Sequence, residues 1–367
     1  MASSKKVTII ANYGSEGEVS DGGRIKVRLY ANLLKKNGIQ VNIIDLDGWK
    51  YKILQTISKI RRAIKNEDVI VIMAGPKGCR VIIPLVNRLN KKKKVRTVFC
   101  PLGIGALDSL LKPLDQEQVI RFLNCESFFS LQDEKMGSEL AKLDLVAPEN
   151  ERLMRVYTEF YKLSNLRLLP NYRDEEVANR AYSVEPGTLR IIYASRICES
   201  KGIFDLMKAV KELDDLSYGI KLDIYGEMQL SGQEKAKFES FMSSNIAYRG
   251  IAKFAEMIDL MKKYDLFCLP TKYYGEGTSG ALVESFIAGT PALVSSYSQA
   301  NLLVNDGVDG FIYRIGDVED LKDKILSVYR DKAKLEAIGK AAQEKAKSYL
   351  FEYNKETFFE AILGRRQ

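Results

Sequence analysis

The chain has 367 residues, of which 46% are hydrophobic and 28% are charged, and its formal net charge is +8 at pH 7. This length exceeds the usual limit of a single hydrophobic core, so we expect two domains. The chain contains no histidine, which excludes a histidine base and a histidine-ligated metal from its chemistry.

The five cysteines are odd in number, scattered and mostly within apolar runs, which is typical of reduced, buried thiols in the cytoplasm. No apolar run reaches the ~18 residues that a membrane-spanning helix needs, and the start of the chain lacks a signal-peptide core. We therefore expect a cytoplasmic protein. Residues 1–100 hold 21 Lys and Arg against 7 Asp and Glu, a net charge of +14. This basic first part predicts an anionic partner, either a phosphate-bearing lipid or nucleic acid.

Short β-branched runs alternate with amphipathic helical stretches, and this spacing indicates parallel sheets covered on both faces. The predicted strands are Val7–Ala11, Val41–Asp45, Val69–Met73, Val95–Cys100, Leu189–Ala194, Leu222–Tyr225, Ile246–Arg249, Leu266–Leu269 and Ala292–Ser295. Each half of the chain therefore predicts one α/β, Rossmann-like domain. Pro170 marks the junction between residues 1–170 and 171–350. The tail, residues 351–367, is predicted to be helical from Phe351 to Leu363 and to pack back onto the first domain.

A glycine-rich loop, residues 12–23, separates the first predicted strand from a helix that begins near Arg24. Gly22 and Gly23 allow the backbone to approach a ligand closely, and the helix end supplies a partial positive charge. The loop is neither a G-x-G-x-x-G fingerprint nor a Walker loop. A flexible surface loop is therefore an equally good interpretation.

The segment Trp49–Lys65 predicts a helix with one isoleucine stripe, surrounded by lysines and arginines. Either this helix faces the core of its domain, or it rests on an anionic membrane surface with Trp49 at the interface. Lys91–Lys94 adds to the same positive field, although it is equally a solvated turn. Both interpretations hold if one face packs inward and the lysines meet lipid headgroups.

Asp45-Leu46-Asp47 is similar to a metal-binding D-x-D motif. It ends the second predicted strand, where paired acids often simply end a strand in solvent. The solvated strand end is the better interpretation, and we expect no metal.

Arg196 and Lys201 follow the predicted strand Leu189–Ala194. Two cations at the carboxyl end of a strand can neutralise a diphosphate, each charge-assisted hydrogen bond contributing about 1.5–3 kcal/mol. A solvated pair of loop side chains is the alternative.

Glu276 and Glu284 lie eight positions apart, with Thr278, Ser279 and Gly280 in the turn between them and an apolar helical run after them. The turn can present several backbone N–H groups at a helix N-terminus, where phosphate binds readily. A phosphate site flanked by carboxylates predicts a nucleotide-sugar site.

The order Arg-x4-Lys-Gly, Glu-x7-Glu and then Ala288-Gly289-x-Pro291 resembles glycosyltransferase family 4. Gly22-Gly23, Pro170-Asn171 and the late turn from Asn305 to Phe311 are also similar to that family. The resemblance implies the GT-B fold, in which two Rossmann-like domains face each other across a cleft. It also implies a retaining glycosyltransferase.

The resemblance implies three catalytic residues. Arg196 and Lys201 would hold the donor diphosphate and stabilise its charge as the sugar leaves, and Glu276 would contact hydroxyls of the donor sugar. It also implies donor-binding positions, with Glu284 at the ribose, Gly250 in the loop at the base, and the remaining residues giving backbone amides to the phosphates. These positions are Gly22, Gly23, Gly250, Thr278, Ser279, Gly280 and Glu284.

The same resemblance implies front-face attack without metal or cofactor, and a nucleotide-diphosphate sugar, UDP favoured, as the donor. A lipid-linked or saccharide acceptor would explain a basic first domain, as in surface-polysaccharide or glycolipid assembly at the inner face of a membrane. Many relatives place a histidine beside the donor sugar. The corresponding region here is Cys100–Gly103, so the contact is either lost or supplied by another residue, with Asp21 and Glu16 as the candidates.

Two other functions are compatible with parts of the sequence. A different GT-B enzyme, such as a nucleotide-sugar epimerase, fits the fold but does not explain the Glu-x7-Glu segment. A basic nucleic-acid-binding protein fits the first hundred residues, but the acidic second half and the lack of clustered aromatic residues weaken this hypothesis.

Overall fold

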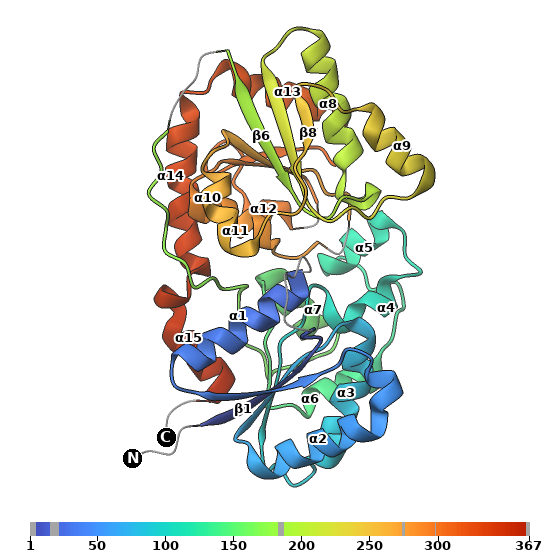
Figure 1. Ribbon diagram of the computed structural model, residues 1–367. Coiled ribbons are helices and arrows are strands. Elements are labelled where there is room, and N and C mark those ends of the chain that lie inside the picture. Colours follow the sequence, from blue (N-terminus) through green and yellow to red (C-terminus); the bar gives the residue numbers. More distant parts are fainter. Residues whose placement is uncertain (1–4, 15–21, 183–186, 274–275, 298, 365–367) are drawn as a thin grey trace. The chain divides into compact units, whose positions relative to one another are not determined.

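The computed structural model describes residues 5–14, 22–182, 187–273, 276–297 and 299–364 (Figure 1). The chain forms two compact units. Unit 1 comprises residues 1–174 and 351–367, and unit 2 comprises residues 175–350. The division follows Asp174, close to the junction expected at Pro170. No helix in the described part of the chain is both long enough and apolar enough to cross a membrane.

Unit 1 is built on a parallel sheet with the strand order β2-β1-β3-β4-β5. The strands are β1 Lys6–Ala11, β2 Gln40–Asp45, β3 Val69–Met73, β4 Arg96–Phe99 and β5 Leu145–Val146. The α-helices are α1 Gly22–Lys36, α2 Ile53–Asn66, α3 Pro76–Leu89, α4 Asp108–Leu111, α5 Gln116–Leu123, α6 Glu134–Ala141, α7 Glu151–Glu159 and α15 Phe351–Leu363, and the 3-10 helices are η1 Trp49–Lys52 and η2 Gly105–Leu107. Every residue of β3 is buried, as expected for a central strand with helices on both faces.

The tail of the chain belongs to unit 1. Helix α15 buries Phe358, Ala361 and Ile362 in the same core as the α1 residues Tyr30 and Leu34. The ring of Tyr30 meets that of Phe358 edge-on, with centroids 5.1 Å apart. One face of the first sheet is therefore covered jointly by the first and the last helix of the described chain.

Unit 2 is built on a parallel sheet with the order β11-β10-β9-β6-β7-β8. Numbered from the first strand of the unit, this is the 3-2-1-4-5-6 order of dinucleotide-binding folds. The strands are β6 Leu189–Ala194, β7 Ile220–Tyr225, β8 Ile246–Tyr248, β9 Leu266–Leu269, β10 Ala292–Ser295 and β11 Phe311–Tyr313. The α-helices are α8 Ile203–Asp215, α9 Gly232–Ser240, α10 Met257–Met261, α11 Gly280–Ala288, α12 Ala300–Leu303, α13 Val318–Arg330 and α14 Lys334–Ala346, and the 3-10 helices are η3 Glu199–Lys201, η4 Phe254–Glu256 and η5 Lys347–Tyr349.

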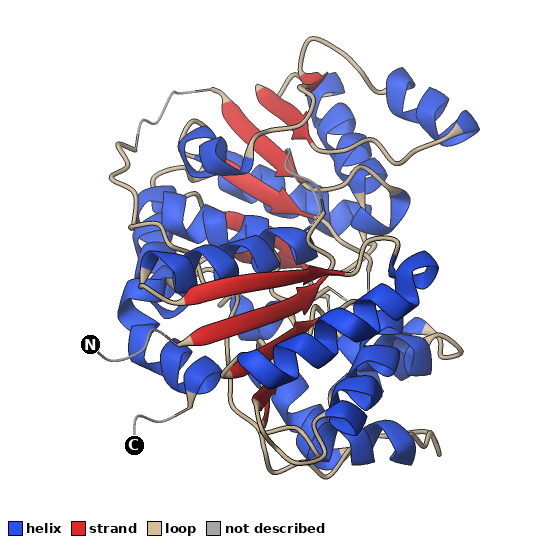
Figure 2. Ribbon diagram, turned by 60° about the horizontal axis from the view of Figure 1, so that its bottom comes forward, coloured by secondary structure: helices blue, strands red, loops and turns tan. Residues whose placement is uncertain are grey.

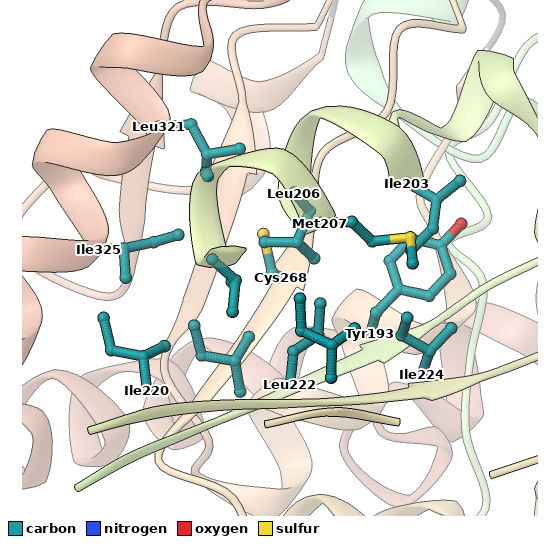
Figure 3. Close-up of a cluster of buried hydrophobic side chains, with 14 of the residues drawn as sticks. Tyr193, Ile203, Leu206, Met207, Ile220, Leu222, Ile224, Cys268, Leu321 and Ile325 are labelled. Carbon is teal, nitrogen blue, oxygen red and sulfur yellow. The ribbon is translucent and has the colours of Figure 1, made fainter. Parts of the chain in front are cut away.

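Helices cover both faces of this second sheet (Figure 2). Neighbouring residues of β6 point to opposite faces. Tyr193 packs in one cluster with Leu206 of α8 and Leu321 of α13 (Figure 3), whereas Ile192 packs in another cluster with Phe286 of α11 and Ala342 of α14. The fold predicted from the sequence, two parallel-sheet Rossmann-like units, is confirmed.

Three details of the prediction were wrong. The strands β5 and β11 were missed, because they have two and three residues and carry little periodic signal. The segment Trp49–Lys65 is not one helix, since η1 precedes α2. Its isoleucine stripe is only partly buried, because Ile60 and Ile64 are in the core while Ile53 is 46% exposed.

Candidate functional site

The strand order of unit 2 reverses between β6 and β9, which are hydrogen-bonded neighbours. In open parallel sheets, ligands bind in the crevice at the carboxyl ends of the strands at such a reversal. The loop after β6 carries Arg196 and Lys201, and the loop after β9 carries Glu276. The fold therefore places the three residues predicted to be catalytic in the two loops that flank this point.

The loop after β6 requires a glycine at position 202, directly after Lys201. Its φ is +71°, and a Cβ built on it would lie 1.8 Å from the carbonyl oxygen of Pro270, at the end of β9. The backbone N–H of Lys272 also donates to the carbonyl of Ser200 at 2.8 Å. The Lys-Gly pair thus docks one loop against the other, and any side chain at position 202 would push them apart.

Lys201 and Glu276 form an ion pair between Nζ and Oε2, although they are 75 positions apart in the sequence. Both side chains are nearly buried, with 6% and 11% exposed. The hydroxyl of Thr271 donates to the same Oε2 at 2.9 Å, and Nζ of Lys201 lies 5.4 Å from the centroid of the Tyr273 ring. A buried cation and a buried carboxylate therefore meet at the strand reversal.

Arg196 lies on the same loop but has an exposed side chain. Its carbonyl accepts a hydrogen bond of 2.7 Å from the buried hydroxyl of Tyr193, and burial raises the pKa of that hydroxyl. Gly226 packs against the same loop, because a Cβ there would lie 1.8 Å from the carbonyl of Ser195. The backbone at Arg196 is thus fixed, while its guanidinium can reach an anion in the crevice.

Helix α11 begins directly after the turn that carries Thr278, Ser279 and Gly280. Ser279 is its N-cap and makes no capping hydrogen bond through its side chain, and the first turn holds no acidic residue. The amides of that turn and the positive end of the helix dipole therefore favour an anion. Glu284 lies in the second turn and is only 5% exposed.

Gly250 follows β8, two strands away from β6 and hence about 10 Å along the sheet edge. Its φ is +83°, and its carbonyl accepts from the N–H of Gly226 at 2.9 Å. Beside it, Arg249 and Tyr264 each bind one oxygen of Asp223, at 2.7 and 2.8 Å. The Asp223 carboxylate raises the pKa of the Arg249 guanidinium. Gly250 thus belongs to the same edge of the sheet, but not to the Lys201–Glu276 contact.

In unit 1, Gly22 and Gly23 open helix α1, whose first turn contains no acidic residue. They follow β1 at the carboxyl edge of the first sheet. Glu16 and Asp21, the candidates to replace the missing histidine, lie outside the described residues.

The carboxylates of Asp45 and Asp47 accept hydrogen bonds from neighbouring residues of unit 1. Asp45 accepts the backbone N–H groups of Tyr13 and Asp47, both at 3.0 Å, and Asp47 accepts from the side chains of Asn12 and Arg24. These contacts connect the loops after β1 and β2. The carboxylates therefore act as ordinary loop supports, which agrees with the interpretation of the motif as a strand end.

Cys100 begins the region where a histidine was expected and is 1% exposed. Burial raises the pKa of its thiol to about 12, so the thiol stays protonated near neutral pH and can be neither a base nor a nucleophile. Close to it, Lys26 of α1 donates to Glu149 at 2.9 Å in an ion pair whose side chains are 3% and 5% exposed.

Two features of these sites were missed from the sequence. Thr271 lies two positions after the end of β9, and the rule that ligands meet the carboxyl ends of strands could have singled it out. The Lys26–Glu149 pair had no local signal, because its partners lie 123 positions apart.

Residues 174–345, nearly the whole of unit 2, match the family model described as Glycosyl transferases group 1. The chain is 25% identical over 147 residues to the capsular polysaccharide biosynthesis glycosyltransferase CapM of Staphylococcus aureus, covering 40% of this chain and 38% of the relative. It is 26% identical over 109 residues to the UDP-Gal:alpha-D-GlcNAc-diphosphoundecaprenol alpha-1,3-galactosyltransferase of Escherichia coli, covering 30% and 28%. The chain thus spans less than half the length of either relative.

Among solved structures, HepE of Anabaena in complex with UDP and glucose superposes with a TM-score of 0.68. The identity is 14%, and the alignment covers 96% of this chain and 98% of HepE. At this identity the likeness concerns the fold alone.

Proposed function

We propose that this chain is a retaining glycosyltransferase that transfers a sugar from a nucleotide-diphosphate sugar, with UDP favoured as the nucleotide. The observation that carries the proposal is the meeting of Lys201 and Glu276 at the strand reversal of unit 2. A cation suits a diphosphate and a carboxylate suits sugar hydroxyls. The group 1 family match of this unit and the UDP bound to HepE support the same donor class.

The donor would lie along the carboxyl edge of the second sheet. The diphosphate would meet Lys201, Arg196 and the amides at the start of α11, which together supply positive charge without a metal. Glu284 would accept hydrogen bonds from the ribose, and the base would lie at Gly250. In this arrangement Glu276 faces the sugar.

Transfer would proceed by front-face attack. The acceptor oxygen forms a bond to the anomeric carbon while the bond from that carbon to the phosphate oxygen breaks, and the acceptor proton passes to the leaving phosphate. Lys201 and Arg196 would stabilise the charge that develops on this phosphate. Glu276 would bind rather than attack, as the resemblance to glycosyltransferase family 4 implies, and its Oε2 is held by Lys201 and Thr271.

The acceptor we propose is lipid-linked or a saccharide, in the assembly of a surface polysaccharide or glycolipid at the inner face of a membrane. The printed names of CapM and of the galactosyltransferase support this class. Exposed apolar side chains in unit 1 support this proposal. Tyr51 of η1 and Ile53 and Leu54 at the start of α2 are 94%, 46% and 79% exposed within the basic segment, which suits an anionic lipid surface.

A thermal-shift screen of UDP, GDP and ADP and their sugar conjugates tests the donor class. We expect UDP-sugars to raise the midpoint most, since a ligand at 100 times its Kd adds about 2.7 kcal/mol to the free energy of unfolding. Glu284→Gln should lower the shift because it removes the ribose contact, while Glu344→Gln, an exposed glutamate of α14, should not. If no nucleotide raises the midpoint and Glu284→Gln changes nothing, the glycosyltransferase proposal fails. Conversion of the donor sugar without any acceptor would indicate an epimerase instead.

A further inference from the structure

Thr271 is fully buried at the end of β9 and is held on both sides. Its carbonyl accepts from the hydroxyl of Ser295, at the end of β10, at 2.5 Å. Its own hydroxyl accepts from the backbone N–H of Tyr273 at 3.2 Å and lies 2.9 Å from Oε2 of Glu276. The hydroxyl therefore connects the rigid sheet edge to the carboxylate.

The direction of the hydroxyl proton follows from these contacts. A hydroxyl has one proton to donate, and an ionised carboxylate can only accept. In the contact with the N–H of Tyr273, the Thr271 hydroxyl oxygen is the acceptor. The hydroxyl proton is therefore available for Glu276, and it points to Oε2 of that carboxylate. This is a charge-assisted hydrogen bond, which is stronger than one between neutral groups.

The two carboxylate oxygens of Glu276 differ in the hydrogen bonds that they accept. Oε2 receives both the hydroxyl of Thr271 and the ammonium of Lys201. Oε1 makes no hydrogen bond to another residue of the described chain. The carboxylate is thus anchored through one oxygen and presents the other.

We propose that Thr271 is a positioning residue that fixes the Glu276 carboxylate through Oε2, so that Oε1 accepts a hydrogen bond from a hydroxyl of the donor sugar. This inference rests on the proposed function. Thr271 touches no substrate, because its hydroxyl is buried between Tyr273 and Glu276. It acts only through the orientation of Glu276.

Lys201 alone is not a sufficient anchor for this carboxylate. Its ammonium has three donors and no fixed fork geometry, and an arriving diphosphate competes for it. The hydroxyl of Thr271 carries no charge, and the backbone carbonyl of Thr271 is held at the sheet edge by the hydroxyl of Ser295, so the diphosphate does not compete for this anchor. When Lys201 turns toward the phosphates, Thr271 keeps Glu276 in place.

Thr271→Val and Thr271→Ser separate the hydroxyl from the shape of the side chain. Valine keeps the shape and loses the hydroxyl, whereas serine keeps the hydroxyl and loses a methyl group. Calorimetric titration of each variant with UDP, and with the UDP-sugar that stabilises the wild type most, measures the extra affinity that the sugar confers. The thermal midpoint without ligand reports whether each variant is folded.

For Thr271→Val we expect the affinity for the UDP-sugar to fall about tenfold relative to that for UDP, the size of one lost charge-assisted hydrogen bond. Affinity for UDP alone should stay within about twofold, and Thr271→Ser should restore the preference for the sugar. With a matching acceptor, kcat/KM should follow the same order.

Three results would overturn the inference. The first is a folded Thr271→Val with the sugar preference of the wild type, and the second is an equal loss of UDP and UDP-sugar binding. The third is a Thr271→Ser that loses the sugar preference as Thr271→Val does, which would indicate packing. If the wild type binds a UDP-sugar and one of these three results is obtained, the inference about Thr271 fails and the proposed function stands. If the wild type binds no nucleotide sugar, the inference and the proposed function both fail.

Discussion

Lys26 and Glu149 form an ion pair that is almost completely shielded from water, at the carboxyl edge of the first sheet. Removing two charges from water costs several kcal/mol, and well-packed apolar residues often stabilise such a position at least as well. A net gain in stability therefore does not explain this pair. It joins the start of α1, which carries Gly22 and Gly23, to the turn before α7, and so fixes where that helix begins.

Replacing Lys26 alone should destabilise unit 1 more than replacing Lys26 and Glu149 together. Lys26→Met removes the cation that neutralises the buried Glu149 carboxylate, so we expect a loss of about 3–5 kcal/mol. Lys26→Met combined with Glu149→Leu should recover most of it. Urea unfolding followed by tryptophan fluorescence measures this in unit 1, because Trp49 is the single tryptophan of the chain. A double variant as unstable as the single one would contradict the account.

The motif in the sequence predicted which residues share one edge of the second sheet, and their binding of a donor stays a prediction. Arg196, Lys201, Glu276 and Glu284 follow a spacing that the fold places around one strand reversal. Their mutual contacts were not predictable, because the ion pair joins two loops whose approach depends on the tight packing of Gly202 on Pro270. The spacing of residues in the sequence identifies candidate side chains, but only the folded structure shows which of them are in contact.

At the scale of elements, α2 has two different ends. Ile60 and Ile64 pack into the core near its C-terminus, while Leu54 at its N-terminus and Tyr51 of η1 are exposed among lysines. The C-terminal half of α2 is therefore a core element, and the proposed lipid contact concerns only the exposed N-terminal half.

We expect the wild type to sediment with vesicles that contain phosphatidylglycerol and not with pure phosphatidylcholine, because each Lys or Arg near an anionic surface contributes about 1 kcal/mol. Added salt should weaken the binding. Tyr51→Ser combined with Leu54→Ser should reduce it by removing apolar side chains, whereas Tyr353→Ser, a 64% exposed tyrosine of α15, should not. Equal sedimentation of both variants would exclude this end of α2 as the contact.

The strands that the sequence predicted with correct bounds are apolar runs that are almost completely buried. β3, β6, β9 and β10 have the predicted bounds, and so does α15. β5 was missed because pairing with β4 decides it rather than its own two residues. Tertiary context overrides local signal most easily in elements this short.

At the scale of the whole molecule, the two units have separate hydrophobic cores. We expect a nucleotide to stabilise unit 2, where the donor residues lie, by mass action. Thermal unfolding followed by far-ultraviolet circular dichroism reports both units, whereas the fluorescence of Trp49 reports unit 1 alone. UDP should therefore raise the dichroism midpoint of unit 2 and leave the Trp49 midpoint within about 1 °C. If both midpoints rise together, the units unfold as one.

Unit 1 is assembled from two stretches of chain that are interrupted by the whole of unit 2. During synthesis, the ribosome therefore completes residues 175–350 before it makes α15, the helix that covers one face of the first sheet with Phe358 and Ile362. At about 5–20 residues per second, the nascent first sheet waits for its last helix for roughly ten seconds or longer. The synthesis of unit 1 thus starts before that of unit 2 and ends after it. Until α15 is made, the first sheet has an uncovered apolar face to which chaperones can bind.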